Sequence, residues 1–375
     1  MKKLFFYGAA ILAVMAAVSC KEIKVNTDTQ VKVEVNFEPA SNTVVDYMLD
    51  GMSSEDGKVL QDSETGEVTV ESVPEAPVEF EASVEENNKF NAGEEVELPK
   101  ICDMTVKVPI SKTFPSDDIF KALEAPYICI TVKNEKGKSF KYTSIIKNEK
   151  TGKIAEVSAD IHETEQEVNL FVSEDGKVMD ESAKNPKAVA AAGFTGLFEG
   201  KPEELKITDA KIQKELPKSA MVTADASALT LDFSALSAFP LTVKNGVPFT
   251  WGWELEVTEK DVQDFLGVKA VEATLLVTHK LPLQMFLNLS EPEQIQAQCD
   301  RINPSLNETE VTQEVNVKAT CEEGVTYFPK AVVLITATLK GNRATYTLSN
   351  AESTAIKIDV KRDENGKKMV KVVMK

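Results

Sequence analysis

The stretch AIKIDVKRDENGKKMVKVVMK, residues 355–375, alternates apolar and polar residues on both sides of a short polar segment. Apolar residues occupy every second position over residues 356–360 and again over residues 370–374. A period of two residues is typical of a β-strand with one buried face. The Asn365-Gly366 pair between the two runs tolerates the positive φ angles of a tight turn. We therefore expect the chain to close here with an antiparallel β-hairpin.

The same two signals, alternation and a turn, recur along the whole sequence. Alternating runs are found at residues 31–37, 78–84, 102–110 and 315–321. Seven segments place glycine near an acidic or amide residue, as turns do, and these are residues 54–59, 63–68, 134–139, 148–153, 173–178, 339–344 and 363–368. Strands separated by turns of this kind are typical of sandwich domains. The sequence predicts an all-β protein of tandem antiparallel, Ig-like β-sandwiches.

The mature chain is long enough for two or three domains. We predict an N-terminal β-sandwich region over residues 20–184, of one or two modules, and a C-terminal β-sandwich region over residues 185–375. The Ala-rich, Gly-broken residues 185–200 are expected to form either a helix or a connector. Short helices are predicted near residues 259–266 and 291–302, the second opened by a capping box of Ser290 and Glu293, and Ser116 precedes a third candidate.

The first residues have the form of an export signal. Lys2 and Lys3 precede an uncharged run over residues 4–18, which is shorter than the ~20 residues that span a membrane. The tetrapeptide Ala17-Val18-Ser19-Cys20 resembles the lipobox of bacterial lipoproteins, in the relaxed form found among the Bacteroidota. The resemblance implies that residues 1–19 are removed, that Cys20 carries the lipid, and that the protein is anchored to the outer membrane. It does not specify the periplasmic or the surface face of that membrane. Cleavage nearby by an ordinary signal peptidase is the alternative.

Charge restricts the partners. Removal of residues 1–19 takes away Lys2 and Lys3, which leaves 40 basic against 60 acidic residues and a formal charge of −20. Such a surface repels nucleic-acid phosphates and anionic lipid headgroups. We expect no nucleic-acid partner, membrane contact through the lipid alone, and a protein or glycan as the partner.

Cysteine and histidine suggest little chemistry. Cys299 and Cys321 lie on the apolar sides of their elements and could form a disulfide, with buried free thiols as the alternative. His162 and His279 lack the spacing of a metal site, so we expect them in strands or turns and predict no metal or cofactor.

Both tryptophans lie in FTWGWELEV, residues 249–257. If exposed, Trp251 and Trp253 would form a stacking platform for sugar rings, because residues two apart share one face of a strand. If buried, they are large core residues. The core is favoured because Leu255 and Val257 share that face.

These observations predict a non-enzymatic, lipid-anchored cell-envelope protein that acts as a binding, adhesion or assembly module, without catalytic residues. One alternative is an accessory glycan-binding lipoprotein of a polysaccharide-uptake system, which requires exposed tryptophans. The second is a hydrolase that uses a pair of carboxylates, which requires a cleft holding two Asp or Glu side chains with raised pKa values.

Overall fold

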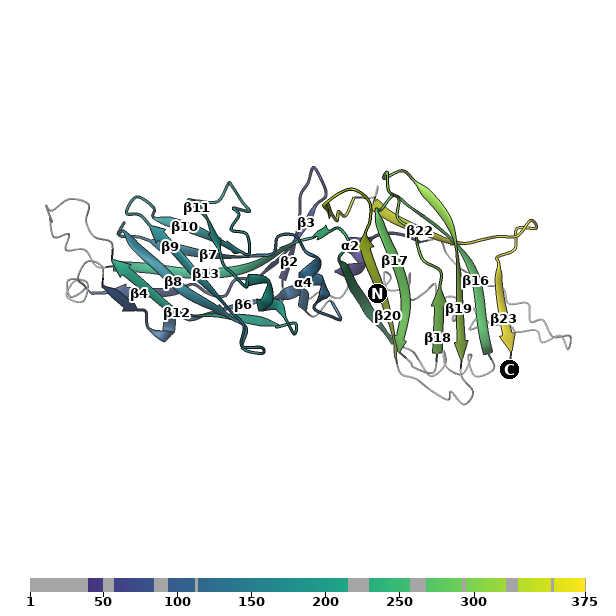
Figure 1. Cartoon of the computed structure of the whole chain (residues 1–375), viewed down its shortest axis with the longest axis horizontal. Helices are drawn as coiled ribbons and strands as arrows, with labels where there is room; N and C mark the ends of the chain where they lie inside the picture. Colours follow the sequence, from purple (N-terminus) through teal and green to yellow (C-terminus); the bar gives the residue numbers. More distant parts are fainter. Residues whose placement is uncertain are drawn as a thin grey trace.

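The computed structural model describes residues 40–49, 57–83, 94–111, 114–214, 229–256, 268–291, 295–321, 330–351 and 354–374. Over these residues the protein is all-β, as predicted, and its strands form two sandwiches arranged end to end along the long axis (Figure 1). The α-helices described are α2 (Val44–Met48) and α4 (Asp118–Ala122), and the 3-10 helices are η1 (Lys100–Cys102), η2 (Pro109–Ser111) and η3 (Phe194–Phe198). Within the described part of the chain, no helix is long and apolar enough to cross a membrane.

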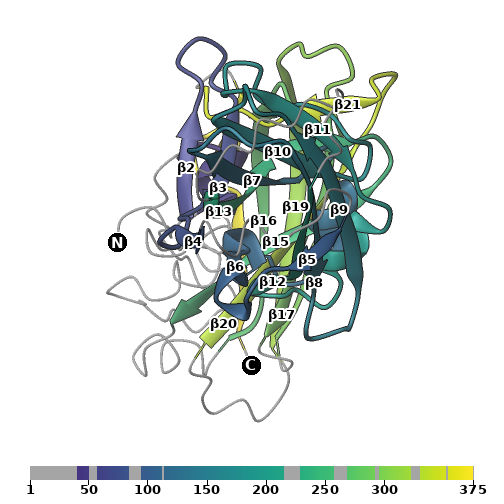
Figure 2. The same cartoon turned by 90° about the vertical axis from the view of Figure 1, so that its left-hand side faces the viewer.

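Sandwich I is made of a seven-stranded and a five-stranded sheet, which face each other when viewed along the long axis (Figure 2). The larger sheet has the order β11-β10-β7-β13-β3-β2, with β4 also on β13, and the smaller has the order β5-β12-β8-β9, with β6 also on β12. All pairings are antiparallel except β10 with β11. The strands are β2 (Gly57–Gln61), β3 (Val68–Ser72), β4 (Val78–Ala82), β5 (Glu95–Glu97), β6 (Met104–Lys107), β7 (Tyr127–Asn134), β8 (Phe140–Lys147), β9 (Ile154–Ile161), β10 (Glu167–Ser173), β11 (Pro186–Ala190), β12 (Glu204–Lys214) and β13 (Leu229–Pro240).

Sandwich II is made of a six-stranded sheet in the order β1-β22-β16-β19-β18, with β23 also on β16, and a three-stranded sheet in the order β15-β20-β17. A separate two-stranded sheet pairs β14 with β21, and β14 follows β13 of sandwich I and precedes β15 of sandwich II in the sequence. The strands are β1 (Ala40–Thr43), β14 (Thr242–Lys244), β15 (Pro248–Glu256), β16 (Val268–His279), β17 (Leu283–Glu291), β18 (Ile295–Cys299), β19 (Val311–Cys321), β20 (Lys330–Leu339), β21 (Thr345–Thr347), β22 (Ala355–Val360) and β23 (Val370–Met374).

The division between the sandwiches differs from the predicted boundary between residues 184 and 185. The strands β11, β12 and β13 belong to sandwich I. In its larger sheet β11 pairs with β10 and β13 lies between β7 and β3, and in its smaller sheet β12 lies between β5 and β8. Residues 185–200 are therefore not a connector. They form β11 and η3, which buries Phe194, Leu197 and Phe198 in the core. The chain passes into sandwich II near Leu241, and β1 already belongs to sandwich II, so sandwich I is inserted between two parts of it.

The final hairpin is only partly as predicted. The strands β22 and β23 do not pair along their length. Both pair with the same side of β16, β22 over Leu275–Thr278 and β23 over Val268–Ala273. The residues between them leave the sheet as an outward loop, residues 361–369, with a single bridge between Arg362 and Lys368. In Figure 1 this loop projects to the right of β16 and β23.

The predicted helix near residues 291–302 is wrong. Residues Ile295–Cys299 form β18, which pairs along its whole length with β19. The hydrogen-bonding edge of β19 overrides a local preference for helix, which is a weak determinant by comparison. The helix predicted near residues 259–266 lies outside the described residues. The third candidate is confirmed as α4, where the Ser116 hydroxyl accepts a hydrogen bond from the Asp118 N–H at 3.3 Å.

The turn chemistry is largely as predicted, because six of the seven turn glycines have positive φ. The β2–β3 and β8–β9 turns, at Gly66 and Gly152, join strands that pair with each other. The β7–β8 turn instead joins strands in opposite sheets of sandwich I. The seventh glycine, Gly57, begins β2.

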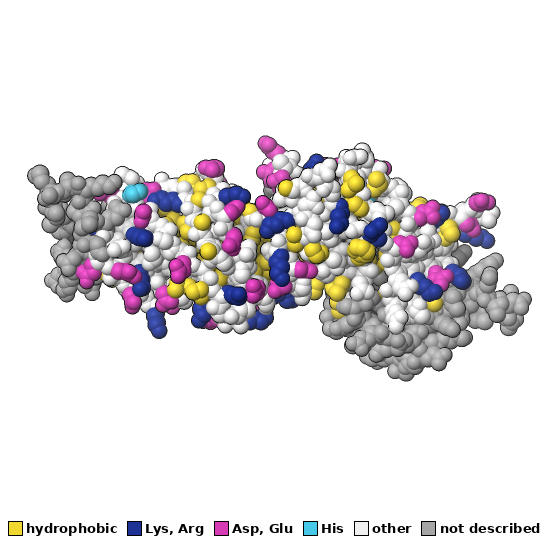
Figure 3. Space-filling view, in the orientation of Figure 1, with side chains coloured by type: hydrophobic (Ala, Val, Ile, Leu, Met, Phe, Trp, Pro, Cys, Tyr) yellow, Lys and Arg dark blue, Asp and Glu magenta, His cyan; other side chains and the backbone are white. Residues whose placement is uncertain are grey.

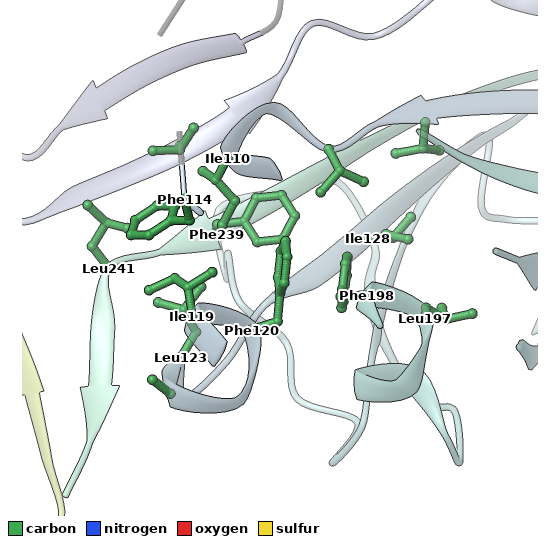
Figure 4. Close-up of a cluster of buried hydrophobic side chains, with 14 of the residues drawn as sticks. Ile110, Phe114, Ile119, Phe120, Leu123, Ile128, Leu197, Phe198, Phe239 and Leu241 are labelled. Atoms are coloured by element: carbon green, nitrogen blue, oxygen red, sulfur yellow. The ribbon is translucent and has the colours of Figure 1, made fainter. Parts of the chain in front are cut away.

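A cluster of buried aromatic side chains fills the end of sandwich I that faces sandwich II (Figure 4). Phe120 from α4 stacks on Phe198 from η3, with ring centroids 4.8 Å apart and planes 11° apart, and Phe239 from β13 meets both edge-on. Beside this cluster the chain ties the two sandwiches together. The Thr250 N–H of β15 donates to the Asp118 carboxylate at 3.3 Å, and the Glu124 N–H donates to the Thr242 carbonyl at 2.8 Å.

Candidate binding groove on sandwich II

A groove of about 640 Å³ crosses the outer face of the six-stranded sheet. Its floor is formed by β16 and β19, one side by the end of β18, and the other by the outward loop and the start of β23. The volume lies within the range of about 300–1,000 Å³ that is usual for small-molecule sites. Figure 3 shows acidic and basic side chains intermixed at the end of the molecule where these strands lie.

The wall made by residues 361–369 is held to the sheet at a single residue of β16. The Lys361 N–H donates to the Thr274 carbonyl at 2.9 Å as the chain leaves, and the Thr274 N–H donates to the Met369 carbonyl at 3.2 Å as it returns. At the tip, the Asp363 carboxylate accepts from the N–H groups of Asn365 and Lys367, both at 2.8 Å. The wall is therefore hydrogen-bonded at its base and at its tip.

One row of groove side chains is ionic and runs across three neighbouring strands. The Glu272 carboxylate of β16 lies 2.9 Å from the Lys318 ammonium of β19 and 3.5 Å from the Lys371 ammonium of β23. The hydrogen bond from Lys318, together with both charges, holds the pKa of Glu272 below its usual value. Ion pairs this exposed contribute little to stability. Their effect is to orient three charged side chains, two positive and one negative.

A second row, of hydrogen-bonded polar groups, lies two residues further along the strands. The Thr274 hydroxyl donates to the Asn316 side-chain oxygen at 3.1 Å, and the Asn316 amide donates to the Asp300 carboxylate at 2.8 Å. The Asn316 backbone N–H donates to the same Asp300 oxygen at 3.0 Å. The groove thus presents hydroxyl, amide and carboxylate groups in fixed orientations beside the ionic row.

Trp251 is a core residue. Its side chain is 1% exposed, and its ring stacks on Phe249 with centroids 5.7 Å apart. It therefore offers no face to a sugar ring. The backbone of Trp253 pairs with Val333 of β20, and its side chain lies outside what the structure describes. Cys20 also lies outside the described residues.

Cys299 and Cys321 do not form the disulfide that was one of the two alternatives. Cys299 is a free thiol, and the register places it opposite Val317, whereas Cys321 lies opposite Ile295. The two cysteines are thus four residues apart along the strands, or roughly 13 Å at the usual rise, which is beyond disulfide reach. Burial raises the pKa of Cys299 to about 12, so its thiol is protonated at neutral pH.

The two histidines occupy ordinary structural positions, as expected. His162 follows β9 in a turn, where its backbone N–H donates to the Glu165 carboxylate at 2.8 Å. His279 ends β16 and is 1% exposed, and its Nδ1 accepts a hydrogen bond from the Leu281 N–H at 3.2 Å. The ring proton of neutral His279 is therefore on Nε2. Burial lowers the pKa of His279 below its ordinary value of 6.5.

We expect His279 to make the protein sensitive to acid. Because its pKa is lower in the folded than in the unfolded state, the unfolded chain binds the proton more readily, and stability falls as the pH falls below about 6.5. The loss attributable to this group is at most about 1.4 kcal/mol per pH unit. Between pH 7.5 and pH 5, the free energy of unfolding measured in urea should fall less for His279→Gln than for the unchanged protein. His162→Gln, in an exposed turn, is the matched control, and an equal drop in both variants would contradict the assignment.

The groove residues were not predicted as a site. The sequence does show that Glu272, Thr274, Asn316 and Lys318 occupy the polar positions of alternating strands, but each such position is an ordinary solvent-facing one. Their grouping follows from the pairing of β16 with β19 and from the outward loop, and neither can be read from local alternation.

Comparison with known proteins gives distant structural similarities. No protein-family model and no curated protein sequence matches the chain. The crystal structure of a candidate secreted protein from Parabacteroides distasonis ATCC 8503 aligns with 89% of this chain and 99% of its own, at 13% identity and a TM-score of 0.48. An agarase, AgWH50C, aligns with 53% of this chain and 24% of its own, at 8% identity and a TM-score of 0.22. Both TM-scores are below 0.5, and neither similarity identifies a function for this chain.

Proposed function

We propose that the protein is a lipid-anchored, non-enzymatic binding module of the cell envelope, held to the outer membrane through Cys20, and that the groove on sandwich II is its binding site. The observation that carries the binding role is the ionic row, in which one carboxylate, Glu272, contacts two ammonium groups. A carboxylate held charged in this way suits recognition. A general acid needs the opposite, a raised pKa that keeps its proton near neutral pH.

The anchor is supported by the residues before the mature chain. The run over residues 4–18 and the Ala17-Val18-Ser19-Cys20 sequence are those that a lipoprotein signal needs. Nineteen residues lie between Cys20 and Ala40, where β1 begins. Because β1 belongs to sandwich II, the tether enters the sandwich that carries the groove, and sandwich I follows later in the chain.

Replacement of Cys20 by alanine tests the anchor. A single Cys20→Ala change removes the sulfur that accepts the lipid, so the exported protein should move almost completely from the membrane pellet to the soluble fraction. Fractionation followed by immunoblotting measures this, and mass spectrometry of the unchanged protein should find acyl chains on Cys20. Cys299→Ala is the control and should stay with the membrane. A Cys20→Ala protein that still pellets with membranes would refute the proposed anchor.

A further inference from the structure

We infer that the groove binds an acidic saccharide, a short oligomer of uronic acid residues. This inference rests on the proposed function, because it names the ligand class of the same groove. It depends on four features of the groove, which are the paired backbone of its floor, its charge, its polar row and its exposed methionine.

The floor excludes recognition through the main chain. Within the groove, β16 is paired on both sides, and β19 pairs with β16 on one side and, from Val317 onward, with β18 on the other. The backbone N–H and C=O groups of Asn316 are taken by Asp300, so the main chain of the floor is already used. A peptide bound here could not add as a further strand, which is how extended peptides gain main-chain hydrogen bonds at sheet edges. A ligand must be recognised through side chains, and hydroxyl-rich ligands suit that requirement.

The charge of the ionic row favours a ligand that carries carboxylates. Lys318 and Lys371 share the single carboxylate of Glu272, so the ionic row has one positive charge in excess, although Asp300, Asp363 and Lys368 make the lining of the groove neutral as a whole. The Lys371 side chain is 70% exposed, which leaves much of its ammonium accessible. An ammonium forms charge-assisted hydrogen bonds with a carboxylate. Because the row offers only two ammonium groups on an acidic surface, a short oligomer with few carboxylates is a better match than a long polyanion.

The polar row and the wall supply what the rest of a sugar needs. Hydroxyl groups both donate and accept, and the row of Thr274, Asn316 and Asp300 offers an oriented hydroxyl, amide and carboxylate. At the wall, Met369 is 40% exposed and lines the groove, where its apolar side chain can lie against the C–H groups of a sugar ring. Carboxylates, hydroxyls and C–H faces occur together in uronic acid oligomers.

Calorimetric titration with defined trimers tests this inference. The probes are trimers of galacturonic, glucuronic and mannuronic acid, the uncharged trimer of each parent sugar, and triglutamate as an acidic peptide. We expect at least one uronic acid trimer to bind at least tenfold more tightly than its uncharged counterpart and than triglutamate. That binding should weaken at least tenfold between 50 and 500 mM salt.

Substitutions in the full-length protein locate the site. Lys318→Gln combined with Lys371→Gln should weaken binding of the uronic acid trimer at least tenfold. Lys357→Gln is the matched control, because Lys357 is an exposed lysine on β22 of the same sheet but does not line the groove. Circular dichroism should be unchanged in all variants, since the Lys318 and Lys371 side chains are 48% and 70% exposed.

Each contrary result has a distinct meaning. Absence of binding by every uronic acid trimer, equal binding of the uncharged trimers, or preference for triglutamate would overturn the acidic-saccharide inference and leave the lipid anchor untouched. Equal weakening by Lys357→Gln would overturn the assignment to the groove. If mass spectrometry recovered the bound trimer cleaved, the saccharide inference would stand and the non-enzymatic function would be overturned.

Discussion

Replacement of Phe120 by alanine is expected to lower the free energy of unfolding by about 3–5 kcal/mol, the usual cost of removing a buried aromatic ring. Phe120 is 2% exposed, stacks on Phe198 and meets Phe239 edge-on, so its removal leaves a cavity among packed rings. Urea unfolding monitored by circular dichroism measures the change. Because α4 also holds Asp118 against β15, exchange of the Thr250 amide hydrogen should become faster.

Phe286→Ala is the matched control for this prediction. Phe286 is 46% exposed on β17, so the same chemical change should alter the free energy of unfolding by less than about 0.5 kcal/mol. If the Phe120 variant lost no more stability than the Phe286 variant, the aromatic cluster would not be the core that Figure 4 shows.

Replacement of Trp251 by alanine is the second large effect, again about 3–5 kcal/mol. Its ring is 1% exposed and stacked on Phe249, and its indole N–H has no hydrogen-bond partner among the described residues. Denaturant unfolding of Trp251→Ala should show the full loss. A stability within 0.5 kcal/mol of the unchanged protein would instead indicate an exposed ring.

The variant Trp251→Phe separates packing from hydrogen bonding. Phenylalanine keeps most of the ring contacts and removes a buried donor, and a donor buried without a partner costs about 1–3 kcal/mol. The loss of stacking area and the removal of the donor should largely cancel. We expect Trp251→Phe to lose less than half of what Trp251→Ala loses. An equal loss in both variants would show that the indole N–H is satisfied.

Local sequence patterns predicted chain reversals better than strand partners. The turns at Gly66, Gly152 and Gly366 all have positive φ, as their sequences require. Only the first two join strands that pair with each other, and the turn at Gly366 becomes the outward loop of the groove. A tight turn reverses the chain by local backbone geometry, whereas pairing depends on which edge elsewhere in the fold is open.

The error at residues 291–302 has the same origin. Ser290 and Glu293 form a capping-box pattern, and the glutamines that follow favour a helix. The run Ile295-Gln-Ala-Gln-Cys299 also alternates with a period of two, and β19 offers it a complete ladder of partners. A local pattern that fits two structures is decided by the tertiary contact.

The sequence by itself determined the fold class, the positions of most turns and the charge of the surface, because alternation, turn chemistry and composition act over a few residues. Only the tertiary structure decided that sandwich I is inserted into sandwich II and that β22 and β23 share one side of β16. The groove arises from that last arrangement. Its polar residues come from strands far apart in the chain, and long-range pairing, which no local pattern encodes, brings them together.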